Sequence, residues 1–154
     1  MKQSLLTLAL GLLLAARALA HGDFELGPNG GRWLDFSENQ TLFGEVTLTN
    51  GVFRVALFDR AKQPVAVTDQ VLTVTGGDRN RPSRPEVKKE GTGFSFPALK
   101  GDKYPLVLQL RPQPGMRPVT ARFTFDAEVC GDCKRQEWLC NCGGDDAKPH
   151  DHGK

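Results

Sequence analysis

The sequence predicts an all-β protein: a small antiparallel β-sandwich or barrel, immunoglobulin-like in architecture, with an irregular, cysteine-rich C-terminal tail. Apolar and polar residues alternate in short runs between residues 41 and 127, which is the pattern of half-buried strands. Gly or Pro marks the junctions between these runs. Because no stretch after residue 20 keeps the apolar period of a helix, about 3.6 residues, we expect little helix.

The clearest strands flank the dipeptide Asn50-Gly51 in the stretch GEVTLTNGVFRVALFD. Asn-Gly readily adopts the positive φ angles of a two-residue hairpin turn, so residues 41–49 and 52–59 are expected to be antiparallel neighbours. A second hairpin is expected to begin near residue 86. The further expected strands are 70–75, 93–96, 104–111 and 119–127.

Residues 1–20 have the composition of a signal peptide. Lys2 precedes an apolar run rich in Leu and Ala, and the sequence ALA at 18–20 supplies small residues for cleavage before His21. The apolar run is shorter than the roughly 20 residues that span a bilayer. We therefore expect a periplasmic or secreted protein with no membrane span after cleavage.

The rest of the chain divides by pattern into four parts. These are an N-terminal segment at 21–40, a β-sandwich domain at 41–127, a cysteine knuckle at 128–143 and a flexible tail at 144–154. Lys2 and Arg17 account for the net charge of +2, so the chain after residue 20 carries equal numbers of basic and acidic residues. A nucleic-acid-binding protein needs a basic face, so nucleic acid is not an expected partner.

The strand-rich part of the sequence shows no catalytic set. All three histidines lie at the ends of the chain, so no Ser-His-Asp arrangement can be traced between them. The paired glycines fall at predicted turns, where their backbone freedom explains them. We therefore expect a protein that is not an enzyme.

All four cysteines fall in the short stretch CGDCKRQEWLCNC, with the spacing Cys-x2-Cys-x6-Cys-x-Cys. Two close pairs joined by a short connector let four thiolates converge on one ion, which suits Zn²⁺ and also Cu⁺. Trp138 in the connector is expected to cover one side of the site. Cleavage before His21 would give that residue an α-amine beside its imidazole, a pair that can chelate a metal ion. His150 and His152 form a His-x-His motif in the tail that can also bind metal ions. The predicted ligands are Cys130, Cys133, Cys140 and Cys142, with His21, His150 and His152 as secondary candidates.

Two alternatives remain open for the cysteines. A secreted chain with an even number of cysteines commonly forms disulfides. That would make the protein a disulfide-stapled interaction module, docking a partner through a sheet edge or the region of Trp33 and Phe36. Cycling of Cys130 and Cys133 would instead make a thiol–disulfide oxidoreductase, although no thioredoxin-like βαβ pattern precedes Cys130.

Four stretches resemble a small β-rich periplasmic domain associated with the adaptor proteins of heavy-metal efflux pumps: GPNGGRWLDF, FGEVTLTNGVFRVALFDRAKQPVAV, FSFPALKGDKYPLVLQL and ARFTFD. In that domain a Gly-Pro-(His or Asn)-Gly-Gly-Arg turn leads into the same strand order, and the resemblance covers residues 27–126. It implies a periplasmic location and metal handling. Asn29 departs from the His form of the turn and lacks its imidazole. The cysteine spacing is also similar to a knuckle of certain RNA-modifying transferases, but only the spacing carries over.

The predicted function is that of a non-enzymatic, secreted or periplasmic accessory protein in zinc or copper homeostasis. Its expected cofactor is Zn²⁺, with Cu⁺ as the alternative and no ion if the cysteines form disulfides. The expected partners are the metal ion and a component of a heavy-metal efflux system.

Overall fold

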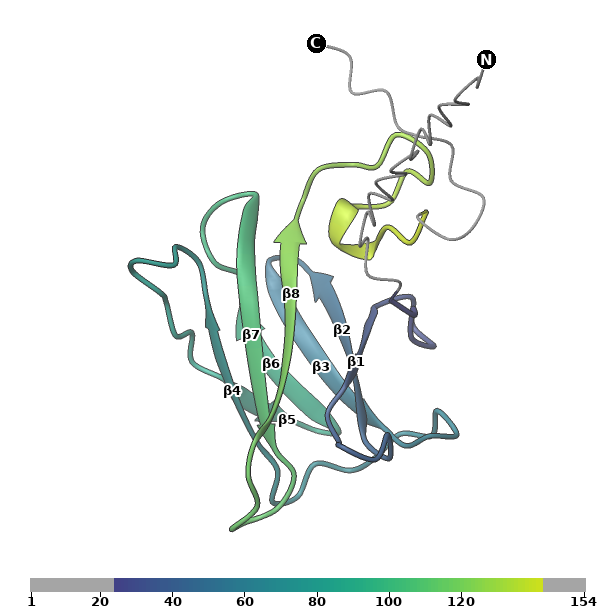
Figure 1. Cartoon of the computed structure of the whole chain (residues 1–154), viewed down its shortest axis with the longest axis vertical. Helices are drawn as coiled ribbons and strands as arrows, with labels where there is room; N and C mark the ends of the chain where they lie inside the picture. The colour runs from purple at the N-terminus through teal and green to yellow at the C-terminus, as the bar shows by residue number, and fades with distance from the viewer. Residues whose placement is uncertain (1–23, 143–154) are drawn as a thin grey trace, which may run out of the picture.

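The computed structural model describes residues 24–142, which form a β-sandwich of two antiparallel sheets (Figure 1). The larger sheet has the order β1-β2-β3-β6-β5 and comprises β1 (Arg32–Asp35), β2 (Phe43–Thr49), β3 (Val52–Phe58), β6 (Gly93–Pro97) and β5 (Lys88–Glu90). The smaller sheet has the order β4-β7-β8 and comprises β4 (Val71–Gly76), β7 (Lys103–Arg111) and β8 (Val119–Asp126). The predicted all-β sandwich is confirmed.

The strand order is that of an immunoglobulin constant domain with one strand added. When β2 to β8 are lettered A to G, the larger sheet contains the order A-B-E-D and the smaller sheet has the order C-F-G. The added strand, β1, pairs with β2 at the edge of the larger sheet. The immunoglobulin-like architecture expected from the sequence is therefore present.

The expected strands agree with the structure to within two residues at each end. Asn50 and Gly51 form the expected hairpin turn between β2 and β3, with φ angles of 52° and 74°. The strand that the sequence did not predict is β1. It is only four residues long and shows no clear alternation, so its pairing with β2 defines it.

Tyr104 fixes the corner between β6 and β7, where the chain crosses from one sheet to the other. Its hydroxyl accepts a hydrogen bond of 3.1 Å from the N–H of Leu99, and its ring lies 4.9 Å from that of Phe125. A tyrosine at the start of strand F that bonds to backbone just upstream is the tyrosine corner of immunoglobulin-like sandwiches. Burial raises the pKa of Tyr104, so its hydroxyl remains protonated at neutral pH.

The core lies between the sheets, where the inward-facing apolar residues of each strand meet. Phe53 on β3 meets Phe125 on β8 edge to face, with ring centroids 5.5 Å apart, and stacks on Phe96 of its own sheet. Each large apolar side chain buried in this way contributes on the order of 1.5–3 kcal/mol to folding. Along β7 the buried residues are Tyr104, Leu106, Leu108 and Leu110.

Phe36, which follows β1, is fully buried in the same core. Its ring occupies the space beside Gly44, where an added Cβ would lie only 2.4 Å from it. The suggestion that Phe36 helps to dock a partner is therefore wrong, because its side chain has no exposed surface to offer. Residues from before position 41 thus contribute to the sandwich core.

The GPNGGR turn, residues 27–32, folds over the side chain of Glu45. Alternation along β2 places Glu45 on the outer face of the larger sheet, yet the turn leaves it only 1% exposed. Its carboxylate accepts hydrogen bonds of 2.7–2.8 Å from the Asn29 N–H, the Asn29 side-chain amide and the Gly31 N–H. A buried carboxylate is tolerated when donors satisfy it in this way. The turn thus has a structural role, and Asn29 is one of its hydrogen-bonding residues.

The glycines of this turn permit its close approach to β2. A Cβ on Gly27 would lie 2.5 Å from the Glu45 carboxyl carbon, and a Cβ on Gly31 would lie 2.4 Å from the carbonyl oxygen of Val46. Both distances are shorter than real Cβ contacts allow. Glycine is therefore required at these positions for steric reasons.

Two parts of the predicted organisation lie outside the described residues: the signal peptide at 1–20 and the tail at 144–154. Within residues 24–142, no helix is long and apolar enough to cross a membrane. The only helical element there is η1 (Glu137–Leu139), a single 3₁₀ turn within the cysteine knuckle.

Candidate metal centre

The cysteine knuckle follows β8 and lies at one end of the sandwich (Figure 1). Its first half is a tight loop closed by an isolated antiparallel bridge between Val129 and Gln136. Inside this loop the Cys130 N–H donates to the Arg135 carbonyl (2.8 Å), and the Lys134 N–H donates to the Cys130 carbonyl (3.1 Å). Lys134 has a φ of 59°, the left-handed conformation that reverses the chain. The loop brings Cys133 back towards Cys130.

The second half of the knuckle contains η1 and the other two cysteines. The Leu139 N–H donates to the Gln136 carbonyl (2.8 Å), and the Cys140 N–H donates to the Glu137 carbonyl (3.1 Å). These bonds turn the chain immediately before Cys140. The short connector between the two cysteine pairs therefore folds back on itself, as the spacing required.

The four cysteine sulfurs gather at one point. All four Sγ atoms of Cys130, Cys133, Cys140 and Cys142 lie within 4.8 Å of one another. The Cys130 sulfur is 3.2 Å from that of Cys140 and 3.9 Å from that of Cys142. A tetrahedral Zn²⁺ with Zn–S bonds of about 2.3 Å separates its sulfur ligands by about 3.8 Å. The cluster therefore has dimensions that suit four ligands around one ion.

All four thiols are free in the structure. A disulfide needs sulfur atoms about 2.05 Å apart, which is shorter than either of the two separations given above. Among residues 24–142, these cysteines are the one group of three or more metal-ligating side chains close enough to hold an ion. The four cysteines can thus bind a metal.

The thiols differ in acidity. The backbone N–H of Arg135 donates to the Cys133 sulfur and lowers the pKa of Cys133 to about 7. Burial raises the pKa of Cys140, partly offset by the N–H of Cys142. Hydrogen bonding to Cys133 raises the pKa of Cys142. At neutral pH the cluster therefore presents Cys133 as its readiest thiolate, and an incoming cation must displace protons from Cys140 and Cys142.

Trp138 was expected to cover one side of the site, but its indole ring packs instead within the sandwich core. It is 2% exposed and lies 5.8 Å from Phe53 and Phe123 and 5.9 Å from Phe125, measured between ring centroids. Phe53 belongs to the larger sheet and the other two to the smaller. Trp138 therefore closes one end of the sandwich and anchors the knuckle there.

Arg32, the last residue of the GPNGGR turn, contacts the knuckle directly. Its Nη1 donates a 2.8 Å hydrogen bond to the Trp138 carbonyl, between residues 106 positions apart in the chain. Its guanidinium lies 3.7 Å from the ring centroid of Phe24 and 5.3 Å from that of Phe123. Burial lowers the pKa of Arg32, although the group remains charged. Sequence reasoning missed this role; the only signal was that Arg32 ends a recognisable motif.

The secondary ligand candidates His21, His150 and His152 lie outside the described residues. The structure therefore brings together the four cysteines and says nothing of these histidines.

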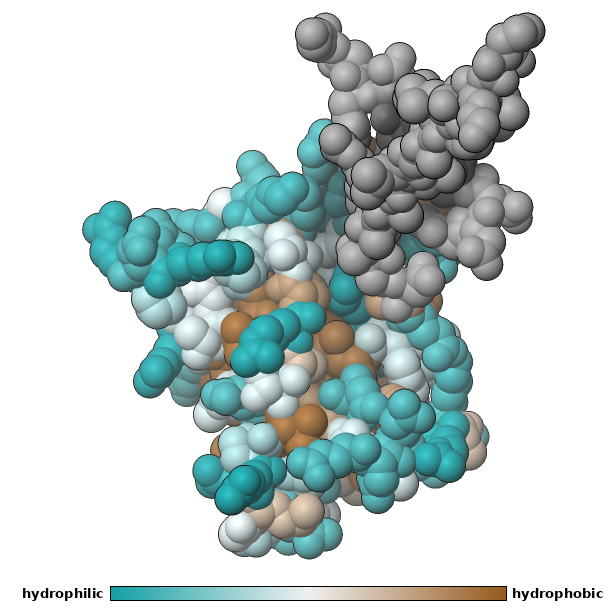
Figure 2. All heavy atoms as spheres, viewed as in Figure 1, coloured by the Kyte–Doolittle hydropathy of each residue, from teal (hydrophilic) through white to brown (hydrophobic). Residues whose placement is uncertain are grey.

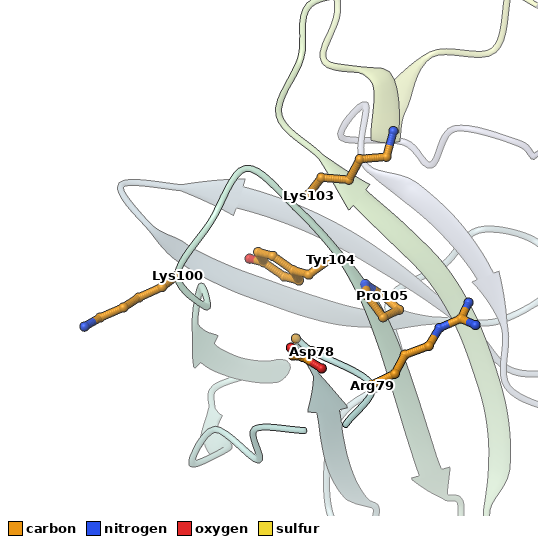
Figure 3. A pocket seen from close by; sticks show the side chains of 7 residues that line it. Asp78, Arg79, Lys100, Lys103, Tyr104 and Pro105 are labelled. Atoms are coloured by element: carbon orange, nitrogen blue, oxygen red, sulfur yellow. The ribbon is translucent and has the colours of Figure 1, made fainter. Parts of the chain in front are cut away.

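An open depression of about 510 Å³ lies at the corner between β6 and β7 (Figure 3). Its basic side chains do not converge. Lys100 and Arg79 point away from the Tyr104 ring in different directions, and Lys103 forms a 2.6 Å ion pair with Asp126. The depression therefore concentrates no positive charge for an anionic ligand. Its lining residues are Gly77, Asp78, Arg79, Lys100, Lys103, Tyr104 and Pro105.

The large apolar residues with exposed side chains are dispersed over the part of the chain that the structure describes. Figure 2 shows apolar side chains near the centre of one face, surrounded by hydrophilic ones. The large apolar residues that are exposed, Val71, Met116 and Val129, come from three separate parts of the chain. Trp33 is only half-buried, but it stacks on Phe43 at the outer face of the larger sheet, 5.2 Å between ring centroids.

Comparison with known proteins identifies no relatives: no family model matches the chain, and no curated protein or solved structure matches it.

Proposed function

We propose that the protein is a metal-binding accessory protein and that its cysteine knuckle is a Zn²⁺ site. The observation that carries this proposal is the convergence of four free cysteine sulfurs within 4.8 Å of one another. Four thiolates in a tetrahedral arrangement are a standard structural ligand set for Zn²⁺. Cu⁺ also favours soft thiolate ligands and is the alternative ion.

Each part of the knuckle has a role in this proposal. Cys133, with its lowered pKa, is the thiol that ionises most readily, and the N–H groups of Arg135 and Cys142 donate to ligand sulfurs. Four thiolates around Zn²⁺ leave two negative charges in excess. Lys134 and Arg135, both in the same loop, offset part of that charge.

The wider role in heavy-metal homeostasis is supported by the sequence. The signal-peptide composition of residues 1–20 supports export to the periplasm or beyond. The resemblance of residues 27–126 to a domain associated with efflux adaptors supports an accessory role without catalysis, with a component of a heavy-metal efflux system as its partner.

Native mass spectrometry of the mature protein, purified under reducing conditions, tests the Zn²⁺ site. We expect a mass gain of one zinc under native conditions and four reactive thiols after denaturation with a chelator. Cys130→Ser should lose the bound ion, whereas Met116→Ser, an exposed change outside the knuckle, should keep it. A denatured mass about 4 Da below the reduced value would show two disulfides instead and reject the site, since each disulfide removes two hydrogens.

A further inference from the structure

The cysteine knuckle has little buried surface of its own. Among its described residues only Cys130 and Trp138 are buried. The Trp138 ring is buried in the sandwich core, where it contacts one ring of the larger sheet and two of the smaller. An aromatic side chain of this size is a major contribution to any core. The position of the knuckle therefore depends strongly on one side chain that belongs to the core of another part of the molecule.

Trp138 lies in the chain between the two cysteine pairs. Cys133 precedes it by five residues and Cys140 follows it by two. The hydrogen bond from the Cys140 N–H to the Glu137 carbonyl holds Cys140 one tight turn from the tryptophan. Movement of Trp138 out of the core would therefore displace Cys140 and Cys142, because the connecting backbone is so short.

Arg32 contacts the same turn through its side chain. Its guanidinium donates to the Trp138 carbonyl, while Phe24 and Phe123 flank it. Its own position follows from the GPNGGR turn, since the Gly31 N–H bonds to the buried Glu45 carboxylate. A continuous set of contacts therefore runs from Glu45 through Arg32 and Trp138 to the cysteines.

We infer that Trp138 and Arg32 are positioning residues of the metal centre, so that metal binding in the knuckle is coupled to closure of this end of the sandwich. This inference rests on the proposed function, because it requires an ion at the four cysteines. Coupling between two such events is reciprocal. Bound metal favours the packed position of Trp138 by the same factor by which that packing favours metal binding. A change that loosens Trp138 or Arg32 therefore weakens metal binding.

Tryptophan fluorescence measures the first half of this coupling. The chain has two tryptophans, so Trp33→Phe leaves Trp138 as the only one. In this variant, removing Zn²⁺ with a chelator should shift the emission to longer wavelength as the indole meets water, and added Zn²⁺ should reverse the shift. Emission that ignores both additions, in protein shown by mass to lose and regain the ion, overturns the inference.

Zn²⁺ affinity, measured by competition with a chromophoric chelator, tests the second half. Trp138→Leu and Arg32→Gln should each weaken Zn²⁺ binding about tenfold or more, because each removes contacts that hold the knuckle against the sandwich. Arg32→Lys keeps the charge but changes the donor geometry. It tests the Arg32 contacts if Arg32→Gln fails to fold. The matched controls Trp33→Leu and Arg54→Gln, on the outer face of the larger sheet, should bind Zn²⁺ as the wild type does.

The outcomes separate this inference from the proposed function. If the wild type takes up no Zn²⁺, the proposed function fails and the inference falls with it. If the wild type binds Zn²⁺ and Trp138→Leu and Arg32→Gln bind it equally well, the metal site stands and only the coupling is wrong.

Discussion

Two loops meet where Arg32 contacts Trp138, and they are stabilised by different chemistry. The GPNGGR turn directs two backbone N–H groups and the Asn29 side-chain amide at the carboxylate of Glu45, so this carboxylate finds its donors within the protein. The loop between Cys130 and Arg135 likewise directs an N–H group at an acidic atom, the Cys133 sulfur, but that sulfur lies beside three more. The acidic group of the first loop has its hydrogen-bond donors within the fold, whereas the second loop gathers four sulfurs that could bind a cation.

The comparison shows how one small protein uses the two arrangements side by side. A buried carboxylate with three donors rigidifies its turn without any external component. The four clustered cysteines can instead share a cation, and under the proposed function the bound ion would stabilise their loop. Arg32 joins the two, because it ends the first loop and bonds to the second.

Removal of Zn²⁺ should have the largest effect on the cysteine loop. If the ion binds at a free concentration a thousandfold above its Kd, chelation should lower the free energy of unfolding by about 4 kcal/mol. Urea unfolding with and without chelator measures this difference. Cys130→Ser should unfold at the same urea concentration in both conditions; a persistent difference would mean that the chelator acts elsewhere.

Replacing Glu45 should break the GPNGGR turn whether or not metal is present. Glu45→Ala leaves buried N–H groups of the turn without an acceptor and should cost about 3 kcal/mol of unfolding free energy. The matched control is Glu38→Ala, an exposed glutamate, which should change stability little. Equal stability of the two variants in urea unfolding would contradict the role given to the Glu45 carboxylate.

Replacing one glycine by alanine in each loop should affect stability differently in the two loops. Gly31→Ala places a Cβ 2.4 Å from the Val46 carbonyl oxygen and should destabilise the protein by roughly 1–3 kcal/mol. Gly131→Ala, in the cysteine loop, meets nothing within 4 Å and should be close to neutral. Thermal unfolding of the pair gives the contrast, and a larger loss for Gly131→Ala would reverse it.

The smallest effect is expected away from both loops, at the tyrosine corner. Tyr104→Phe keeps the ring against Phe125 but removes the acceptor for the Leu99 N–H, at a cost of about 1 kcal/mol. Zn²⁺ affinity should not change, because the ring keeps its place against Phe125 and the lost hydrogen bond lies at Leu99, away from Trp138. A drop in Zn²⁺ affinity would show that the coupling extends through the whole sandwich.

The strands and the hairpin were predictable because their signals are local. Alternation along β7 and β8 already marks which side chains face inward, and Asn50-Gly51 specifies its turn through the φ angles of two adjacent residues. The cysteine cluster was predictable for a similar reason, since all four residues lie within a short stretch of chain. The boundaries of the strands differed by no more than two residues.

Residues with long-range roles were not predictable in this way. Glu45 follows the polar half of the β2 alternation, so its burial appears only when the GPNGGR turn covers it. Phe36 stands outside any alternating run, and its place beside Gly44 depends on how the chain enters β2. Trp138 was expected to cover the cysteines, but its ring is buried at one end of the sandwich core, beside Phe53.

The sequence by itself determined the short amphipathic strands and the turns between them. It also determined that four cysteines are close enough along the chain to share one ion. Each of these depends on the conformation of neighbouring residues, which the order of amino acids specifies directly. Only the tertiary structure decided that Arg32 reaches a carbonyl 106 residues away and that Trp138 completes the sandwich core. Such contacts exist only after the sheets have packed, because packing brings distant parts of the chain within bonding distance.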